Sequence, residues 1–223
     1  MPLKPHGYLD IDGYSWESIQ TDNIIHFREA CQEILDSTDK SFGVRGALRR
    51  SEELTRLSNE YLVPIAKRHL GSNAFIVRSI LFDKPLDANW AVPWHQDVTI
   101  EVESKQDVPG FGPWSTKDGM DSVQPPAEVL EKMLTLRLHL DDTDGTNGAL
   151  IVDPSSHLEG KKHINDIQAK NPVVLSCRSG AVLLMKPLLY HASNRSTSGK
   201  PRRILHLDFA ANPLPEPLVW KKF

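Results

Sequence analysis

The sequence of 223 residues lacks every feature that would tie it to a membrane or to nucleic acid. No apolar run approaches the roughly 20 residues that a membrane-spanning helix needs, and the first eight residues contain no apolar signal core. The formal net charge is −3, without a polybasic run, so no positive field attracts phosphates or anionic lipids. We therefore expect no nucleic-acid partner and no membrane partner.

Cysteine is also scarce, since the chain has only Cys31 and Cys177, far apart in the sequence. Disulfides are rare in reducing compartments, and free cysteines are usually buried. We interpret both residues as free, buried thiols, and we expect a cytoplasmic protein.

Hydrophobic residues make up 39% and charged residues 25% of the chain, which is ordinary for a folded protein. The length suits one domain over residues 1–223, with ample material for a core. We expect a monomer or a weak homodimer.

The first third of the domain, about residues 20–72, shows helical spacing. Apolar residues recur every three or four positions between Ile24 and Leu35, after a possible cap at Thr21 or Asp22. Ser51 is a good cap for a second helix that runs to about Leu70. Pro64 lies inside that pattern and is expected to kink or split the helix.

From Phe75 the period of the pattern changes to two, which predicts strands. About eight short strands separated by turns follow, up to about residue 211. Strands after an N-terminal helical part favour a mainly β fold, a sandwich or jelly roll, over a parallel α/β sheet.

Residues 103–127 interrupt these strands with a segment rich in Gly, Pro and Trp. A long loop inside a compact domain is usually functional or disordered. Aromatic residues argue against disorder, so we interpret the segment as a lid over an active site. Its Phe111 and Trp114 are candidates for substrate contact, although anchoring of the loop explains them equally well.

The stretch from Asn89 to Glu101 contains the candidate metal ligands His95 and Asp97. Two residues apart on an extended backbone point to the same side, so both can reach one metal ion. His-x-Asp alone is weak evidence: roughly one match is expected by chance from ordinary composition, and the chain has three, at 95–97, 139–141 and 206–208. The first is preferred because it lies between strands and precedes the candidate lid.

The preferred third ligand is His191, which follows an apolar strand and Pro187. Two histidines and one carboxylate form the facial triad of non-haem Fe(II) oxygenases. Eleven residues later, Arg202 opens another apolar strand. A guanidinium there suits the bidentate capture of a carboxylate.

This combination, with the segment Gly-Ala-Leu-Ile-Val-Asp-Pro-Ser-Ser-His157, resembles the phytanoyl-CoA dioxygenase family over about residues 75–210. The resemblance implies a double-stranded β-helix, Fe(II) bound by His95, Asp97 and His191, and 2-oxoglutarate held through its distal carboxylate by Arg202. It also implies a reaction with dioxygen that releases succinate and CO2 as the substrate is hydroxylated. The family usually has Gly where this chain has Ser155.

Apolar and polar residues alternate along two predicted strands, and this pattern adds residues to the candidate site. Leucines occupy one face of residues 133–142 and of 203–209, and we expect these faces to pack on the N-terminal helices. The polar faces would line the barrel interior and bring Thr135 and His206 near Arg202 as cosubstrate-binding residues, although solvated polar faces are the alternative. Candidate substrate-binding residues are Arg78, Trp94 and Arg137.

The sequence therefore predicts an Fe(II)- and 2-oxoglutarate-dependent hydroxylase of a small molecule. The interior arginines suggest that this substrate bears a carboxylate. Two alternatives stay open: a jelly-roll metal-dependent hydrolase or isomerase that does not use 2-oxoglutarate, and a non-catalytic jelly-roll binding module.

Overall fold

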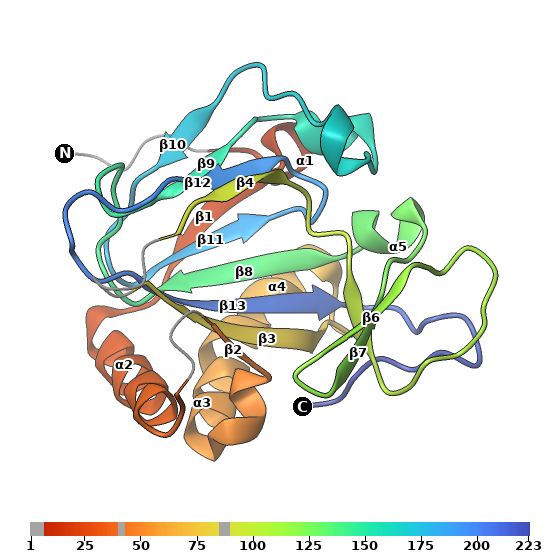
Figure 1. The fold of residues 1–223 in the computed structure, drawn as a ribbon. Coiled ribbons are helices and arrows are strands. Elements are labelled where there is room, and N and C mark those ends of the chain that lie inside the picture. The colour runs from red at the N-terminus through yellow and green to blue at the C-terminus, as the bar shows by residue number, and fades with distance from the viewer. Residues whose placement is uncertain (1–6, 40–42, 85–89) are drawn as a thin grey trace.

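The structure is a computed structural model that describes residues 7–39, 43–84 and 90–223. Asn89, the first residue of the stretch around the candidate ligands, lies outside the described residues. Two antiparallel sheets face each other, and helices cover the outer face of the larger sheet (Figure 1). No helix in the described part of the chain is long and apolar enough to cross a membrane.

The larger sheet has six strands. In spatial order they are β1 (Tyr14–Ser18), β11 (Ala181–Met185), β8 (Leu134–His139), β13 (Arg203–Ala210), β3 (Phe75–Asp83) and β2 (Val44–Arg45). The smaller sheet has the order β10 (Val173–Leu175), β9 (Leu150–Val152), β12 (His191–Ser193) and β4 (Val92–His95). The chain crosses repeatedly between the two sheets, which is the connectivity of a jelly roll. The predicted fold class is confirmed.

A third, small sheet corrects our prediction for residues 103–127. Its strands are β5 (Ile100–Val102), β7 (Met120–Val123) and β6 (Trp114–Lys117). The expected structureless loop therefore contains a hairpin, with Asp118 and Gly119 at its turn at φ values of 52° and 74°. An Asp-Gly pair favours such a turn because both central residues need positive φ.

The helices largely follow the predicted pattern. They are α1 (Leu9–Asp12), α2 (Thr21–Asp36), α3 (Glu52–Leu57), α4 (Val63–Leu70) and α5 (Ala127–Glu131). Thr21 lies inside α2, whose N-cap is Gln20, so our assignment of that cap was wrong. Ser51 does cap α3, because its Oγ accepts a hydrogen bond from the Leu54 backbone N–H.

The second predicted helix is split. A π-helical turn, Ser58–Leu62, separates α3 from α4, and Pro64 lies in the first turn of α4. Proline lacks a backbone N–H and is tolerated only near a helix start, so the split agrees with the expectation. Short 3-10 turns complete the helical segments, at Ala47–Arg50, Ser156–Glu159 and Ile164–Asp166.

The two faces of the larger sheet divide as the alternation predicts. The leucine face of β8 and β13 packs with α2, α3 and α4 in one apolar cluster, while the other face looks toward the smaller sheet. Leu134, Leu136, Leu138, Leu205 and Leu207 are all fully buried there. Each such side chain contributes about 1.5–3 kcal/mol by leaving water. This packing fixes the register of the strands and hence the direction of their polar residues.

Candidate metal centre and cavity

The end of β4 and the start of β12 bring two histidines together. His95 and His191 lie directly opposite each other across the antiparallel pair, and their ring centroids are 4.0 Å apart. The chain then turns, and the Asp97 backbone N–H donates to the Pro187 carbonyl at 2.9 Å. This bond places Asp97 Oδ2 at 3.6 Å from His191 Nε2. One ligand atom from each of the three residues lies within 4.8 Å of the other two.

Hydrogen bonds set the orientation of both imidazoles. His95 Nδ1 lies 2.8 Å from the Pro93 carbonyl oxygen, and His191 Nδ1 lies 2.8 Å from the Leu189 carbonyl oxygen. A carbonyl only accepts, so each Nδ1 carries the proton and each Nε2 keeps its lone pair for a metal. Burial and the neighbouring His95 lower the pKa of His191 to about 3, which keeps that ring neutral.

The carboxylate of Asp97 completes a donor set that fits Fe(II). Burial opposes its ionisation, but His191 and Arg78 hold its pKa well below the usual range. Its Oδ2 is buried and has no hydrogen-bond partner among the described residues. An unpartnered buried oxygen is costly unless something binds it. Two imidazole nitrogens and one carboxylate oxygen, converging on one point, are the ligand types of the facial triad.

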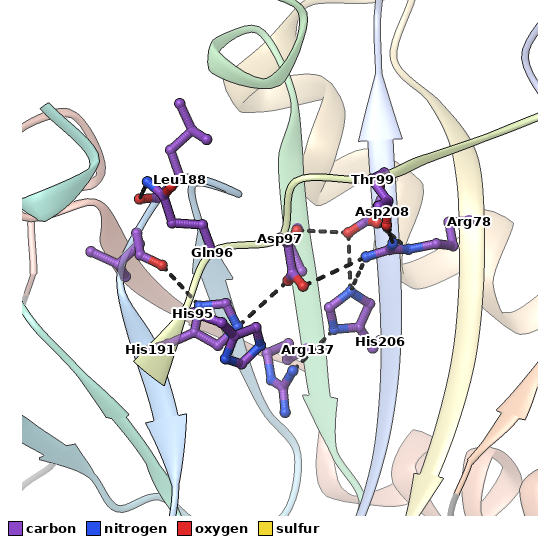
Figure 2. Close-up of polar contacts among 12 residues, drawn as sticks. Arg78, His95, Gln96, Asp97, Thr99, Arg137, Leu188, His191, His206 and Asp208 are labelled. Atoms are coloured by element: carbon purple, nitrogen blue, oxygen red, sulfur yellow. Dashed lines mark hydrogen bonds and ion pairs between the residues drawn. The ribbon is translucent and has the colours of Figure 1, made fainter. Parts of the chain in front are cut away.

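Gln96, which we did not predict, holds this turn from behind. Its side chain points away from the two ligands and is buried. Its Nε2 donates to the carbonyls of Gly160 and Leu188, at 2.8 and 2.7 Å, and its Oε1 accepts from the Lys162 backbone N–H at 2.8 Å. Figure 2 shows the bond to Leu188. The middle residue of the motif thus ties the ligand pair to two other segments. The sequence signal was its position, since a residue between two ligands on an extended chain must face the opposite side.

A cavity of about 340 Å³ opens beside the three ligands. Its lining includes Arg45, Arg78, Lys117, Arg137, Ser193 and Arg202. Arg45, Lys117 and Ser193 are additions to the predicted set. A larger groove of about 820 Å³ lies between the helices and the C-terminal segment, but none of the predicted site residues lines it.

Arg202 is the most isolated charge in this cavity. It is 4% exposed, and its Nε and Nη1 have no hydrogen-bond partner in the described part of the chain. Burial and the neighbouring charge of Arg137 lower its pKa to about 10, so it remains cationic at neutral pH. A buried guanidinium without a counter-ion is unfavourable. The site therefore suits an anion, above all a carboxylate that can accept two parallel hydrogen bonds.

The other predicted cosubstrate residues have protein partners. Thr135 Oγ1 donates to Asp208 Oδ1 at 2.7 Å, and His206 Nε2 lies 3.1 Å from the same oxygen. His206 lines the cavity, whereas Thr135 is not among its lining residues. Both side chains point into the barrel interior as expected, but both form contacts with Asp208.

The predicted substrate residues separate into two groups. Arg78 and Arg137 line the cavity. Trp94 is half-buried outside its lining, and Phe111 and Trp114 pack on the apolar cluster around Ile100 and Val123. The observed contacts of Phe111 and Trp114 thus agree with the interpretation that these aromatic residues anchor the segment 103–127. Trp90, which we had not proposed, does line the cavity.

The side chains of the two rival His-x-Asp pairs contact other protein groups. His139 Nδ1 contacts Thr143 Oγ1 at 3.1 Å, and Asp141 forms an ion pair with Arg203 at 2.8 Å. His206 contacts Asp208 within its own strand. In the described ranges, His95, Asp97 and His191 are the one group of three such side chains whose ligand atoms converge.

Comparison with known proteins agrees with this geometry. A family model described as phytanoyl-CoA dioxygenase matches residues 21–204. The chain belongs to the phytanoyl-CoA dioxygenase family. At the turn where the family usually has Gly, Ser155 adopts a positive φ of 68°, the left-handed conformation that glycine adopts most easily.

Curated relatives include Uncharacterized protein Mb1539 of Mycobacterium bovis and Uncharacterized protein Rv1501 of Mycobacterium tuberculosis. Each is 30% identical over 107 residues, which is 46% of this chain and 39% of the relative. The match thus spans well under half of the length of these relatives.

Several solved structures share the fold. The carbocyclase SnoK from nogalamycin biosynthesis has a TM-score of 0.71 at 18% identity, over 95% of this chain and 94% of that chain. The epimerase SnoN from the same biosynthesis has 0.69 at 15%, over 91% and 77%. EctD from S. alaskensis, solved with 2-oxoglutarate and 5-hydroxyectoine, has 0.67 at 21%, over 94% and 76%.

Proposed function

We propose that this protein is an Fe(II)- and 2-oxoglutarate-dependent dioxygenase that hydroxylates a small molecule bearing a carboxylate, with release of succinate and CO2. The observation that carries the proposal is a single cavity that holds three converging ligands and also a buried guanidinium, that of Arg202, which has no counter-ion among the described residues. Family membership supports the same chemistry. The free, buried Cys31 and Cys177 agree with a cytoplasmic location.

In this proposal, His95 Nε2, His191 Nε2 and Asp97 Oδ2 hold the iron. Arg202 binds the distal carboxylate of 2-oxoglutarate. When bound, the iron and the cosubstrate supply the activation of dioxygen. The protein contributes fixed ligand directions and a shaped cavity beside the metal. Arg137, whose Nε has no partner among the described residues, is our candidate for the carboxylate of the substrate.

The test begins without oxygen. Fe(II) and 2-oxoglutarate added to the purified protein should produce a weak visible charge-transfer band, and admission of oxygen should then release succinate. His191→Ala should abolish both signals, whereas His26→Ala is the matched control, because His26 is an exposed histidine on α2. Folded wild-type protein that gives neither band nor succinate would rule out this function.

The outcome of the oxidation is a separate question, because two structures with this fold are described as a carbocyclase and an epimerase. Hydroxylation predicts that one atom of labelled dioxygen enters the product. Product formation and succinate release without label in the product would favour cyclisation, epimerisation or desaturation. Metal binding without any affinity for 2-oxoglutarate would favour a hydrolase, an isomerase or a binding module.

A further inference from the structure

A row of charged and polar side chains crosses the interior face of the larger sheet behind Asp97. Arg78 on β3 lies directly opposite Asp208 on β13, and Asp208 lies directly opposite Thr135 on β8. Directly opposed residues of neighbouring antiparallel strands point to the same face. All three therefore point into the barrel, where Arg78 is 6%, Asp208 3% and Thr135 0% exposed.

Asp208 is fully occupied by protein partners. Its Oδ2 lies 2.6 Å from Arg78 Nε, and its Oδ1 accepts from Thr135 Oγ1 at 2.7 Å. His206 is the third partner of Asp208. Its Nδ1 faces Arg137 Nη1 at 3.0 Å and must accept, because a guanidinium only donates. The proton of the neutral ring is thus on Nε2, which donates to Asp208 Oδ1 at 3.1 Å. Asp208 is a fixed anchor for Arg78.

The opposite end of the Arg78 guanidinium reaches the metal carboxylate. Nη1 donates to the Thr99 carbonyl at 3.1 Å, two residues after Asp97, and Nη2 lies 3.9 Å from Asp97 Oδ1 (Figure 2). That separation is too long for a hydrogen bond but short enough for attraction between the charges. Asp97 Oδ2, on the His191 side, is the unpartnered oxygen. The two oxygens of Asp97 therefore have different surroundings.

We propose that Arg78 is a positioning residue: anchored by Asp208, it attracts Oδ1 of Asp97 and leaves Oδ2 as the single metal-binding oxygen. This inference rests on the metal site proposed above. It also assigns Arg78 to the metal carboxylate instead of the substrate, since its nitrogens already face Asp208, Thr99 and Asp97. Without Arg78, Asp97 would be free to rotate and to bind the metal through both oxygens.

The experiment uses Co(II) as the probe, with metal-free full-length protein and visible absorption as the readout. Removal of an outer partner of a ligand typically weakens metal binding by about 10- to 100-fold. We expect a loss of that size in Arg78→Met, with a weaker visible band because a bidentate Asp97 raises the coordination number. Arg78→Lys, which restores the charge, should recover most of the affinity.

Two variants guard against a simple folding defect. Arg78→Met combined with Asp208→Asn removes both buried charges and should fold, yet still bind Co(II) weakly. Arg203→Met is the matched control, because it breaks the ion pair with Asp141 on the same strand and should leave the Co(II) affinity and spectrum unchanged.

The possible outcomes separate the two proposals. Wild-type affinity and spectrum in the folded double variant would overturn the role of Arg78, as would an equal loss in Arg203→Met. Failure of the wild-type protein to bind Co(II) at the three ligands would instead overturn the proposed function.

Discussion

Replacement of Arg202 by Met should have opposite effects on the ligand-free protein and on its complex with 2-oxoglutarate. Arg202 is buried, and two of its nitrogens have no partner among the described residues. Substitution of buried charges by apolar side chains of similar volume often stabilises a protein, by about 1–4 kcal/mol. In a chain of this length, 1 kcal/mol corresponds to about 2–4 °C in Tm. Arg202→Met should therefore raise the Tm of the ligand-free protein by roughly 2–16 °C.

Binding of 2-oxoglutarate should weaken in the same variant. Truncation of one partner of a buried, hydrogen-bonded charge pair costs about 2–5 kcal/mol. At 1.4 kcal/mol for each tenfold change, Kd should rise by roughly 30- to 4,000-fold. The assay is a thermal melt of Co(II)-loaded protein with and without 2-oxoglutarate. Ligand at 100 times Kd stabilises wild-type protein by about 2.7 kcal/mol, and at the same ligand concentration this stabilisation should fall to about 0.9 kcal/mol or less in Arg202→Met.

Arg203→Met gives the control for both halves of this prediction. Arg203 is the next residue of the chain, but it forms an ion pair with Asp141 at 2.8 Å outside the cavity. Its replacement should lower Tm and leave the 2-oxoglutarate affinity intact. A fall in Tm together with unchanged 2-oxoglutarate affinity in Arg202→Met would show that Arg202 is structural and that the cosubstrate assignment is wrong.

Three further predictions concern the support of the site. Gln96→Ala removes three hydrogen bonds behind the ligands and should weaken Co(II) binding about 10-fold, measured by titration. Leu207→Ala should reduce the free energy of unfolding by about 2–5 kcal/mol, because Leu207 is fully buried. Ile25→Ala is the control, because Ile25 is exposed. A loss below about 0.5 kcal/mol for Leu207→Ala, measured by unfolding in urea, would contradict the observed packing. Burial and nearby arginines lower the pKa of His139 to about 3, so as pH falls the unfolded chain takes up a proton at this histidine before the folded protein does. The free energy of unfolding should therefore fall as pH drops from about 6.5 to 3, by up to about 1.4 kcal/mol per pH unit. Unfolding in urea at several pH values should show a weaker pH dependence in His139→Gln.

The division between apolar and polar faces was predictable because one strand-like period covers each of β8 and β13. Leu205 and Leu207 alternate with His206 and Asp208, and only one of the two faces can contact the helices. The pairing of β1 with β11 was not predictable, since a short segment carries no signal for a long-range partner. The hairpin in 103–127 was missed although Asp118-Gly119 is a strong turn signal.

His95 and Asp97 were predictable from their spacing on an extended backbone, and His191 from its place after an apolar strand and from the family resemblance. The partners of those ligands were not. Sequence alternation places Arg78 and Asp208 on interior faces, but it does not say that they lie opposite each other, because register between distant strands is set by packing. The same limit explains why Arg78 and Arg137 had equal standing as substrate residues. Only the structure separates Arg78, which forms an ion pair with Asp208 at 2.6 Å, from Arg137, which contacts the imidazole of His206.

The different partners of Arg78 and Arg137 bear on the charge of the substrate. The cavity lining contains five cationic side chains, Arg45, Arg78, Lys117, Arg137 and Arg202, and one carboxylate, Asp97. Asp208, just outside the lining, offsets Arg78. A divalent metal adds positive charge, and a dianionic cosubstrate balances only part of the total. Because electrostatic interactions strengthen where water is excluded, the remaining charge favours an anionic substrate over a neutral or cationic one. Arg137 lies deep in the barrel beside His206, so we expect the anionic group of the substrate to lie close to the carbon that reacts.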